Sequence, residues 1–450
     1  MLKKPAVALL VVLVCRAQGA AGQAPVYKLL YSPPPSNTNL GSFYELFEGK
    51  PGLFYVLSAW TGGTTGASIF TVSSGGVFKP IYSFPPATFV NVLQPTNGEL
   101  YGSGYTGIPP NSTNFYYSMG ASGGNLQEYP MPAPWAPGFE TTVAPPNQMY
   151  DLVGQITTNH TLWAFARVSE SGRLTILHQF TASEGVPAYT AIILGPDGNF
   201  YGIGAQSPVG ISPTFIYQFT PAGAYSRILT FPQVPSYDAL PIVAATDGNI
   251  YGTFAKGGVN NTGLIYQATL SGQLHVQASF PASISSPRTL MQAADGDLYG
   301  TTVYNQIFRY NLTTHALTLV YQMDVAAAQG ECPCALVEGT DGRLYGAASN
   351  GGPYPGMGAV FSLDIGLPKP LPAVTGLYPS SGAAGQKVLL WGNYLLGATS
   401  VSFDGVPAQY IGVTSIQSVW ATVPAGAATG PVTVTTPIGS FTTTTNFTVP

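Results

Sequence analysis

The sequence TDGNIYGTFAKGG, from Thr246 to Gly258, has a close counterpart in TDGRLYGAASNGG, from Thr340 to Gly352. The core of this motif is a turn followed by an apolar residue and a tyrosine, and it recurs along the whole chain. The tyrosines of its copies are Tyr55, Tyr101, Tyr150, Tyr201, Tyr251, Tyr299 and Tyr345, with the weakest copies around Tyr55 and Tyr150. A catalytic loop normally occurs once in a chain, so a motif that occurs seven times indicates a repeated structural unit.

The spacing and the strand pattern of the repeat predict its fold. Successive motif tyrosines stand 46 to 51 residues apart. The fifth unit contains four strand-like pieces, ALPIVAA, IYGTFA, LIYQATL and QLHVQASF, which we name strands a to d in chain order. Asp-Gly between strands a and b indicates a hairpin, and we expect a type I′ turn with positive φ at both central residues. Seven units of four antiparallel strands predict a seven-bladed β-propeller, with the motif tyrosine packed between blades.

The composition agrees with an all-β fold. Charged residues make up only 8% of the 450 residues, and the chain contains 54 Gly and 40 Pro. Glycine and proline disfavour long helices, whereas Tyr, Val, Thr and Phe suit strands. The net charge is −4 and the 15 Lys and Arg are scattered, so we expect no nucleic-acid partner.

The last unit lacks a fourth strand. It contains CALVEG, RLYGAAS and AVFSLDI, after which the sequence changes character. The segment VYKLLYS, residues 26–32, has the pattern of a strand d. We therefore expect residues 26–32 to pair with AVFSLDI and to close the last blade, because closure removes two exposed sheet edges.

The two ends of the chain differ from the repeats. Lys3 and Lys4 precede the apolar run Pro5–Val14 and then small residues, which is typical of a signal peptide over residues 1–23. This predicts a secreted or cell-surface protein, and no later apolar run is long enough for a transmembrane segment in the mature chain. We expect the propeller over residues 24–366, a proline-rich linker over 367–373 and a β-sandwich over 374–450.

The loops suggest where a ligand would bind. The a–b and c–d turns are short and uniform, whereas the b–c and d–a connections are long and varied, and variable loops usually carry binding. Four aromatic residues lie in or beside the b–c loops, namely Trp60, Tyr105, Tyr304 and Tyr354. They could stack on sugar rings or anchor a peptide, or they could pack against neighbouring loops.

Chemically reactive residues are sparse. Cys332 and Cys334 form a disulfide candidate or two structural thiols, with a redox or copper role as an alternative. The four histidines are spread singly, and we assign no catalytic residue, no metal site and no cofactor. An acid pair for a lyase or hydrolase could still form if folding gathers inner-strand acids around the central channel. The acids in question are Glu45, Glu140, Asp238 and Glu338.

Two family resemblances follow from these motifs. The repeats, DGxLYG followed by GG and an aromatic strand c, resemble the GloVer tandem repeats of bacterial surface proteins over about Glu45–Asp364. The resemblance implies a surface location and no particular activity. Residues 374–450, with YPSSGAAG, LLWGNYL and VSFDGVPA, resemble the immunoglobulin-like IPT/TIG domains. That resemblance implies an extracellular spacer or binding module.

We therefore expect an exported, non-enzymatic propeller that binds or displays glycans or surface proteins outside the cell. The alternative is an extracellular carbohydrate-active enzyme, a polysaccharide lyase or glycoside hydrolase, with its site at the mouth of the channel. A third interpretation is a purely structural envelope protein. The fold alone does not distinguish these functions.

Overall fold

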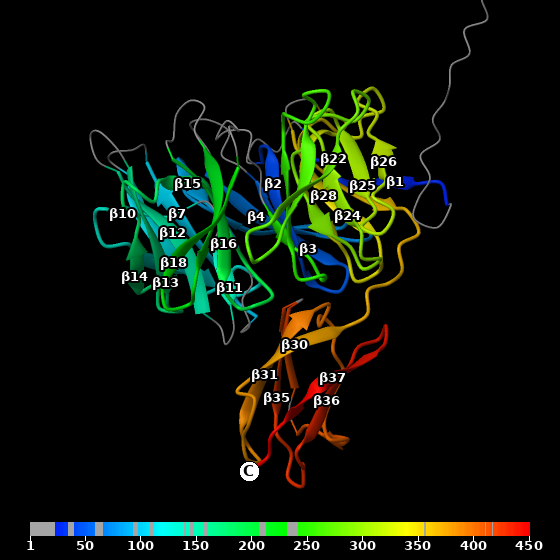
Figure 1. Ribbon diagram of the computed structural model, residues 1–450. Coiled ribbons are helices and arrows are strands. Elements are labelled where there is room, and N and C mark those ends of the chain that lie inside the picture. The colour runs from blue at the N-terminus through cyan, green and yellow to red at the C-terminus, as the bar shows by residue number, and fades with distance from the viewer. Residues whose placement is uncertain are drawn as a thin grey trace, which may run out of the picture.

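The computed structural model describes residues 23–34, 40–58, 66–92, 98–107, 112–138, 141–144, 148–156, 161–206, 213–231, 242–354, 357–409, 411–415 and 417–450. Within these ranges every regular element is a β-strand (Figure 1). None of the described residues belongs to a helix that is long and apolar enough to cross a membrane. The predicted signal peptide, apart from Gln23, lies outside the described residues.

In the described residues, the first 364 positions of the chain form seven antiparallel sheets, which we number in chain order. Sheet 1 contains β2 (Phe43–Lys50), β3 (Leu53–Ser58), β4 (Ser68–Ser73) and β5 (Phe78–Ser83), and sheet 2 contains β6 (Thr88–Val90), β7 (Leu100–Thr106), β8 (Thr113–Met119) and β9 (Gln127–Pro130). Sheet 3 contains β10 (Trp135–Ala136), β11 (Thr142–Ala144), β12 (Gln148–Ile156), β13 (Thr161–Val168) and β14 (Leu174–Gln179). Sheet 4 contains β15 (Val186–Leu194), β16 (Phe200–Ala205), β17 (Thr214–Phe219) and β18 (Tyr225–Phe231).

Sheets 5 to 7 follow the same order. Sheet 5 contains β19 (Val243–Ala244), β20 (Ile250–Phe254), β21 (Leu264–Ala268) and β22 (Leu274–Ser279). Sheet 6 contains β23 (Met291–Gln292), β24 (Leu298–Thr301), β25 (Gln306–Tyr310) and β26 (Leu317–Gln322). Sheet 7 contains β27 (Glu331–Glu338), β28 (Leu344–Asn350), β29 (Ala359–Asp364) and β1 (Val26–Tyr31).

The fourth strand of sheet 7 comes from the other end of the chain. β1 pairs antiparallel with β29, with Val26 opposite Asp364 and Tyr27 opposite Leu363. The ring of Tyr27 stacks on Phe361 of β29, with centroids 5.6 Å apart. Sheet 7 thus joins the two ends of the repeat region.

The Asp-Gly turns do not have the expected type I′ geometry. In the fourth turn, the N–H of Gly198 donates to the carbonyl of Gly195 over 3.1 Å, and the N–H of Gly195 donates to the carbonyl of Asn199 over 2.7 Å. Gly198 has φ of 78°, whereas Asp197 has no positive φ. The expectation of two residues with positive φ is therefore wrong, and the loop is the three-residue hairpin whose last position needs glycine.

The motif aspartate and tyrosine form one hydrogen-bonded unit. Asp197 Oδ1 accepts the N–H of Asn199 over 3.2 Å, and its Oδ2 accepts the hydroxyl of Tyr201 over 2.8 Å. The same tyrosine bond, also 2.8 Å long, joins Tyr251 to Asp247, Tyr299 to Asp295 and Tyr345 to Asp341. Because burial and the neighbouring carboxylate raise the pKa of Tyr201, its hydroxyl stays a donor. The repeated D-G-x-x-Y spacing is explained by this closed turn.

The glycine after the tyrosine makes room for an aromatic residue of strand c. A Cβ atom on Gly252 would lie 2.2 Å from the hydroxyl oxygen of Tyr266, and one on Gly346 would lie 2.1 Å from Cζ of Phe361. Such distances are far below van der Waals contact. The Tyr-Gly pair is thus required by packing within the sheet.

Each motif tyrosine also packs against the next sheet. Tyr251 of sheet 5 lies in an apolar cluster with Leu298 and Phe308 of sheet 6. Tyr345 of sheet 7 lies in a cluster with Phe54 of sheet 1, and the two ring centroids are 3.9 Å apart. Among the described residues, all seven motif tyrosines sit in such a cluster. Sheet 7 therefore packs against sheet 1 as the other sheets pack against their successors.

A hydrogen bond repeats between sheets beside these clusters, and we call it the inter-sheet lock. Its acceptor is the side chain seven residues before a motif tyrosine, and its donor is a backbone N–H in the turn of the preceding sheet. The three locks join Gln292 to Thr246, Glu338 to Ala294 and Glu48 to Thr340, each over 2.8 Å. The last of them connects sheet 1 to sheet 7, which are the most distant sheets in sequence.

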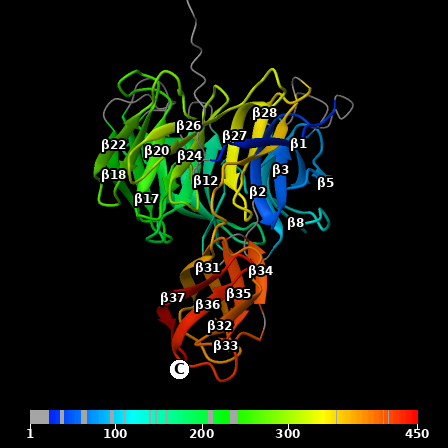
Figure 2. The ribbon, with the colours of Figure 1, turned by 90° about the vertical axis from the view of Figure 1, so that its right-hand side faces the viewer.

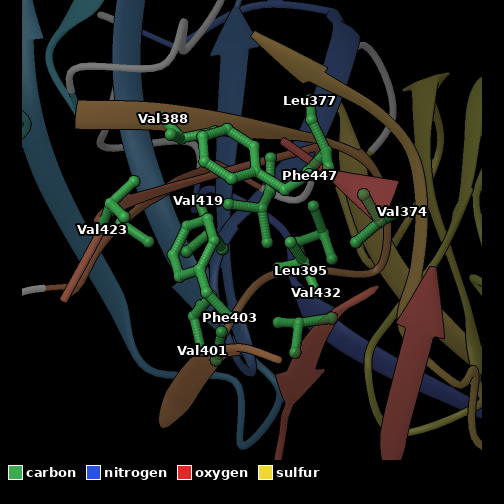
Figure 3. Packing of buried hydrophobic residues seen from close by; sticks show 14 residues of the cluster. Val374, Leu377, Val388, Leu395, Val401, Phe403, Val419, Val423, Val432 and Phe447 are labelled. Atoms are coloured by element: carbon green, nitrogen blue, oxygen red, sulfur yellow. The ribbon is translucent and has the colours of Figure 1, made fainter. Parts of the chain in front are cut away.

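The C-terminal residues form a separate module of two four-stranded sheets. One contains β30 (Ala373–Tyr378), β31 (Lys387–Asn393), β35 (Ser418–Thr422) and β34 (Ile411–Ser415). The other contains β33 (Val406–Pro407), β32 (Ser400–Phe403), β36 (Gly430–Thr435) and β37 (Ser440–Phe447). Valines from both sheets surround Phe403 and Phe447, whose ring centroids are 5.0 Å apart (Figure 3). The module has its own core, distinct from those of the repeats.

Replacing Gly252 by alanine should destabilise the repeat region by about 1–3 kcal/mol, because the new methyl group overlaps the Tyr266 hydroxyl. Gly75→Ala is the matched control, because Gly75 is exposed and its nearest neighbour would be Ser73 Oγ at 3.5 Å. Thermal unfolding of both variants checks this expectation. Equal melting temperatures for the two variants would contradict the packing role of the Tyr-Gly pair.

Candidate binding face

The C-terminal module identifies the two faces of the repeat region. We call the end that carries the a–b turns the turn face and the opposite end, with the b–c connections, the loop face. The hydroxyl of Tyr394, in the module, donates to Glu338 Oε2 over 2.6 Å beside the a–b turn of sheet 7. Figures 1 and 2 both show the module below the repeat region, at the turn face. The loop face lies on the other side.

The four predicted aromatic residues have different environments. Trp60 lies outside the described residues. Tyr105, at the end of β7, stacks on Phe89 of β6 with centroids 5.2 Å apart, so it packs within its own sheet. Tyr354 and Tyr304 are exposed, with 37% and 60% of their surface accessible. The three described tyrosines come from sheets 2, 6 and 7.

Tyr304 lies on a turn that several hydrogen bonds hold in place. Its N–H donates to Thr302 Oγ1 over 3.2 Å, and its carbonyl accepts from Gln322 Nε2 over 3.2 Å. The next residue, Asn305, accepts the N–H of Cys332 at its Oδ1 over 2.6 Å, which ties the turn to sheet 7. The backbone that carries the exposed ring is therefore held in place, which lowers the entropy cost of ordering this turn on binding.

The two inner-strand acids that the structure describes, Glu45 and Glu338, bond to different sheets. Glu45 accepts the N–H of Val92 in sheet 2 over 3.0 Å, whereas Glu338 bonds to Ala294 in sheet 6 and to Tyr394. Burial raises the pKa of Glu338 to about 7. The other two acids of the hypothesis, Glu140 and Asp238, lie outside the described residues. The two described acids thus serve different contacts between sheets.

Cys332 and Cys334 are both free thiols in the structure. Arg288 Nη1 donates to Sγ of Cys332, and the thiol of Cys334 donates to the carbonyl of Phe43 in sheet 1 over 2.8 Å. Burial raises the pKa of Cys334 to about 12. Of the alternatives that the sequence leaves open, the geometry matches two thiols with separate structural partners.

One polar cluster is not predicted by the sequence. His178 Nε2 lies 3.1 Å from Glu184 Oε2, and the His178 ring stacks on Tyr225 with centroids 5.4 Å apart. Arg227 Nη2 donates to the carbonyl of Glu184 over 3.1 Å and its guanidinium lies 3.9 Å above the Phe215 ring. The sequence signal for this cluster is weak, because its members come from two units and each histidine looks solitary.

This cluster joins the outer strands of sheets 3 and 4. Burial acts to raise the pKa of Glu184, but hydrogen bonds from Thr181 and His178 lower it overall. The carboxylate is thus held ionised by its neighbours and fixes the connection between the two sheets. In the part of the chain that the structure describes, no group of three or more His, Cys, Asp or Glu could hold a metal ion.

Two family models match the second half of the chain. Residues 213–401 match the family model described as the Gloeobacter/Verrucomicrobia repeat, and residues 372–449 match the IPT/TIG domain model. The comparison with curated proteins gives no significant match. These matches confirm the two predicted resemblances over residues 213–401 and 372–449.

Solved structures support the fold. An oligogalacturonate lyase in complex with manganese is 14% identical, with a TM-score of 0.52 over 78% of this chain and 95% of that chain. The extracellular domain of a protein described as a hybrid two component system from B. thetaiotaomicron is 11% identical, with a TM-score of 0.50, and the match covers 95% of this chain and 57% of that chain. The WD40 β-propeller domain of Doa1 is 10% identical, with a TM-score of 0.48, and the match covers 74% of this chain and 96% of that chain. At these identities the similarity to the first two structures concerns the fold alone, and within the described residues of this chain every regular element is a strand.

We expect the two thiols to differ in reactivity. Iodoacetamide at pH 8 should alkylate Cys332 first, because burial keeps Cys334 protonated far above neutral pH. Peptide mapping by mass spectrometry measures the two rates, with Cys332→Ser and Cys334→Ser as controls. Equal rates in the native protein, or a mass consistent with a Cys332–Cys334 disulfide, would contradict this assignment.

Proposed function

We propose that this chain, with its Gloeobacter/Verrucomicrobia repeats and IPT/TIG domain, is an exported binding or display module for glycans or surface proteins. In this proposal residues 1–23 direct export and residues 24–366 form a seven-bladed β-propeller that residues 26–32 close. A linker over residues 367–373 leads to an immunoglobulin-like β-sandwich over 374–450, which acts as a spacer or a second contact.

The cyclic packing supports the proposed ring. The Phe54–Tyr345 stack and the Glu48–Thr340 lock place sheet 1 beside sheet 7. These contacts repeat the ones made by neighbouring sheets elsewhere in the chain. A closed ring also accounts for the position of β1, which pairs with the last repeat and not with the first.

The observation that carries the binding role is the exposed ring of Tyr304 on a hydrogen-bonded turn. A tyrosine offers an apolar face for a sugar ring and a hydroxyl for a hydrogen bond. Val303, which precedes Tyr304, is 42% exposed, and Val325, in the connection from sheet 6 to sheet 7, is 43% exposed. The IPT/TIG domain at the turn face leaves this side of the propeller available to a partner.

The alternative function is an extracellular carbohydrate-active enzyme. The observation that favours it is the cluster of His178, Glu184, Tyr225 and Arg227, which brings together an acid, a base and a cation. Against it, the polar groups of this cluster bond to one another, and they lie on the outer strands β14 and β18 and on the connection that carries Glu184. Lyase and reducing-sugar assays of the mature chain on acidic and neutral polysaccharides distinguish the two functions.

A glycan array and a surface-protein panel should identify a ligand whose affinity depends on Tyr304. Tyr304→Ala should weaken binding by about two- to tenfold, since one aromatic stacking contact is worth about 0.5–1.5 kcal/mol. Tyr378→Ala, at an exposed tyrosine of the IPT/TIG domain, is the control and should bind normally. Polysaccharide turnover by the wild-type protein, or equal losses in both variants, would contradict the proposal.

A further inference from the structure

Arg288 is a cation without a counter-charge at the loop face. It lies in the connection from β22 to β23, and its backbone N–H donates to the carbonyl of Thr301, at the end of β24, over 2.8 Å. The side chain is partly buried, and its guanidinium donates to the sulfur of Cys332 in β27. Among the described residues, no carboxylate oxygen lies within 4.0 Å of this guanidinium.

Two other arginines of sheets 6 and 7 show what Arg288 lacks. Arg309 Nε donates to Asp297 over 2.6 Å, and Arg343 Nε donates to Asp364 over 3.3 Å. The thiol that Arg288 contacts is only a weak hydrogen-bond acceptor and brings no opposite charge. Because a partly buried cation is costly when no anion meets it, an anion from outside the chain would stabilise this arrangement.

The acids of the connection from sheet 6 to sheet 7 have other partners. Glu331 Oε2 accepts the side-chain amide of Asn350 over 2.9 Å. Asp324 Oδ1 accepts two backbone N–H groups of its own loop, over 2.9 and 3.2 Å. In the part of the chain that the structure describes, neither carboxylate forms an ion pair with Arg288. The positive charge of Arg288 thus remains available to a ligand.

Arg288 is connected to the turn that carries Tyr304. Cys332 donates its backbone N–H to Asn305 Oδ1 over 2.6 Å, while its sulfur accepts from Arg288. Asn305 follows Tyr304 directly, so one residue of sheet 7 contacts both the turn and the guanidinium. Within the described repeat region, the exposed tyrosines Tyr304 and Tyr354 come from sheets 6 and 7, which are the two sheets that this contact joins.

We propose that the ligand of the loop face is an acidic glycan, whose carboxylate or sulfate group binds Arg288 while a sugar ring stacks on Tyr304. A guanidinium presents a planar fork of N–H donors that matches the oxygens of such a group. Peptide anchors usually fill pockets, whereas both tyrosine rings are exposed, so a sugar is the better match. The inference rests on the proposed binding function and adds the charge class of the ligand.

An array of acidic glycans with uncharged counterparts tests this proposal. It pairs alginate, hyaluronan and polygalacturonate with their methyl esters, and dextran sulfate with dextran, which separates carboxylate from sulfate recognition. The wild type should bind at least one acidic member about tenfold or more tightly than its uncharged counterpart. Raising the salt concentration should weaken binding to the acidic member, because the charges are screened, and this measurement needs no variant.

Variants assign the preference to Arg288. Arg288→Gln should weaken binding to the acidic glycan by about ten- to hundredfold and remove the preference over the ester. Arg288→Lys, which keeps the charge but not the fork, should recover part of the affinity. Arg173→Gln, at an exposed arginine in the c–d turn of sheet 3 on the turn face, is the control and should bind as the wild type does.

The outcomes separate this inference from the proposed function. Tyr304-dependent binding to neutral glycans only, equal binding of acid and ester, or unchanged binding by Arg288→Gln would overturn the acidic-glycan inference and leave the binding function standing. Binding of polyglutamate that depends equally on Arg288 would also overturn it, because the ligand would then be an acidic peptide. A chain that binds no glycan and no surface protein would overturn both.

Discussion

The fold depends on a contact that each sheet makes with the one before it. In sheets 1, 6 and 7 a side chain seven residues before the motif tyrosine accepts a backbone N–H from the turn of the preceding sheet, as Gln292 does from Thr246. Beside this bond, the tyrosine of the preceding sheet is buried in an apolar cluster with the next one. Burial of a large side chain is worth about 1.5–3 kcal/mol, so the clusters supply most of the energy and the hydrogen bonds fix the register.

The same contact explains why the chain has a turn face and a loop face. The locks bind the a–b turns of sheets 5, 6 and 7 to neighbouring sheets, and an Asp–Tyr bond fixes each of these three turns. The b–c connections at the other end are free of this constraint and vary in length. The IPT/TIG domain contacts the constrained end through Glu338 and Tyr394. The proposed binding residue Tyr304 lies at the loop face, on a turn that the bond from Cys332 to Asn305 ties to sheet 7.

Much of this architecture can be predicted from the sequence, because the motif repeats at a nearly constant spacing and each copy needs the same residues. The turn type could not be predicted, since Asp-Gly suits both a two-residue and a three-residue loop, and the tyrosine bond that favours the latter comes from four residues further on. The separation of Glu45 from Glu338 and the contact of Glu338 with Tyr394 depend on which sheets become neighbours. The cluster around His178 likewise joins residues from two units, each of which looks ordinary alone.

The contact between sheet 1 and sheet 7 is the central claim, and hydrogen exchange measured by mass spectrometry tests it most directly. Glu48→Ala should speed amide exchange in the turn of residues 339–343, because the N–H of Thr340 loses its acceptor. Gln292→Ala should speed exchange in the turn of residues 245–249 and leave the other turn protected. If Glu48→Ala leaves residues 339–343 as protected as in the wild type, the two ends of the repeat region are not joined as described.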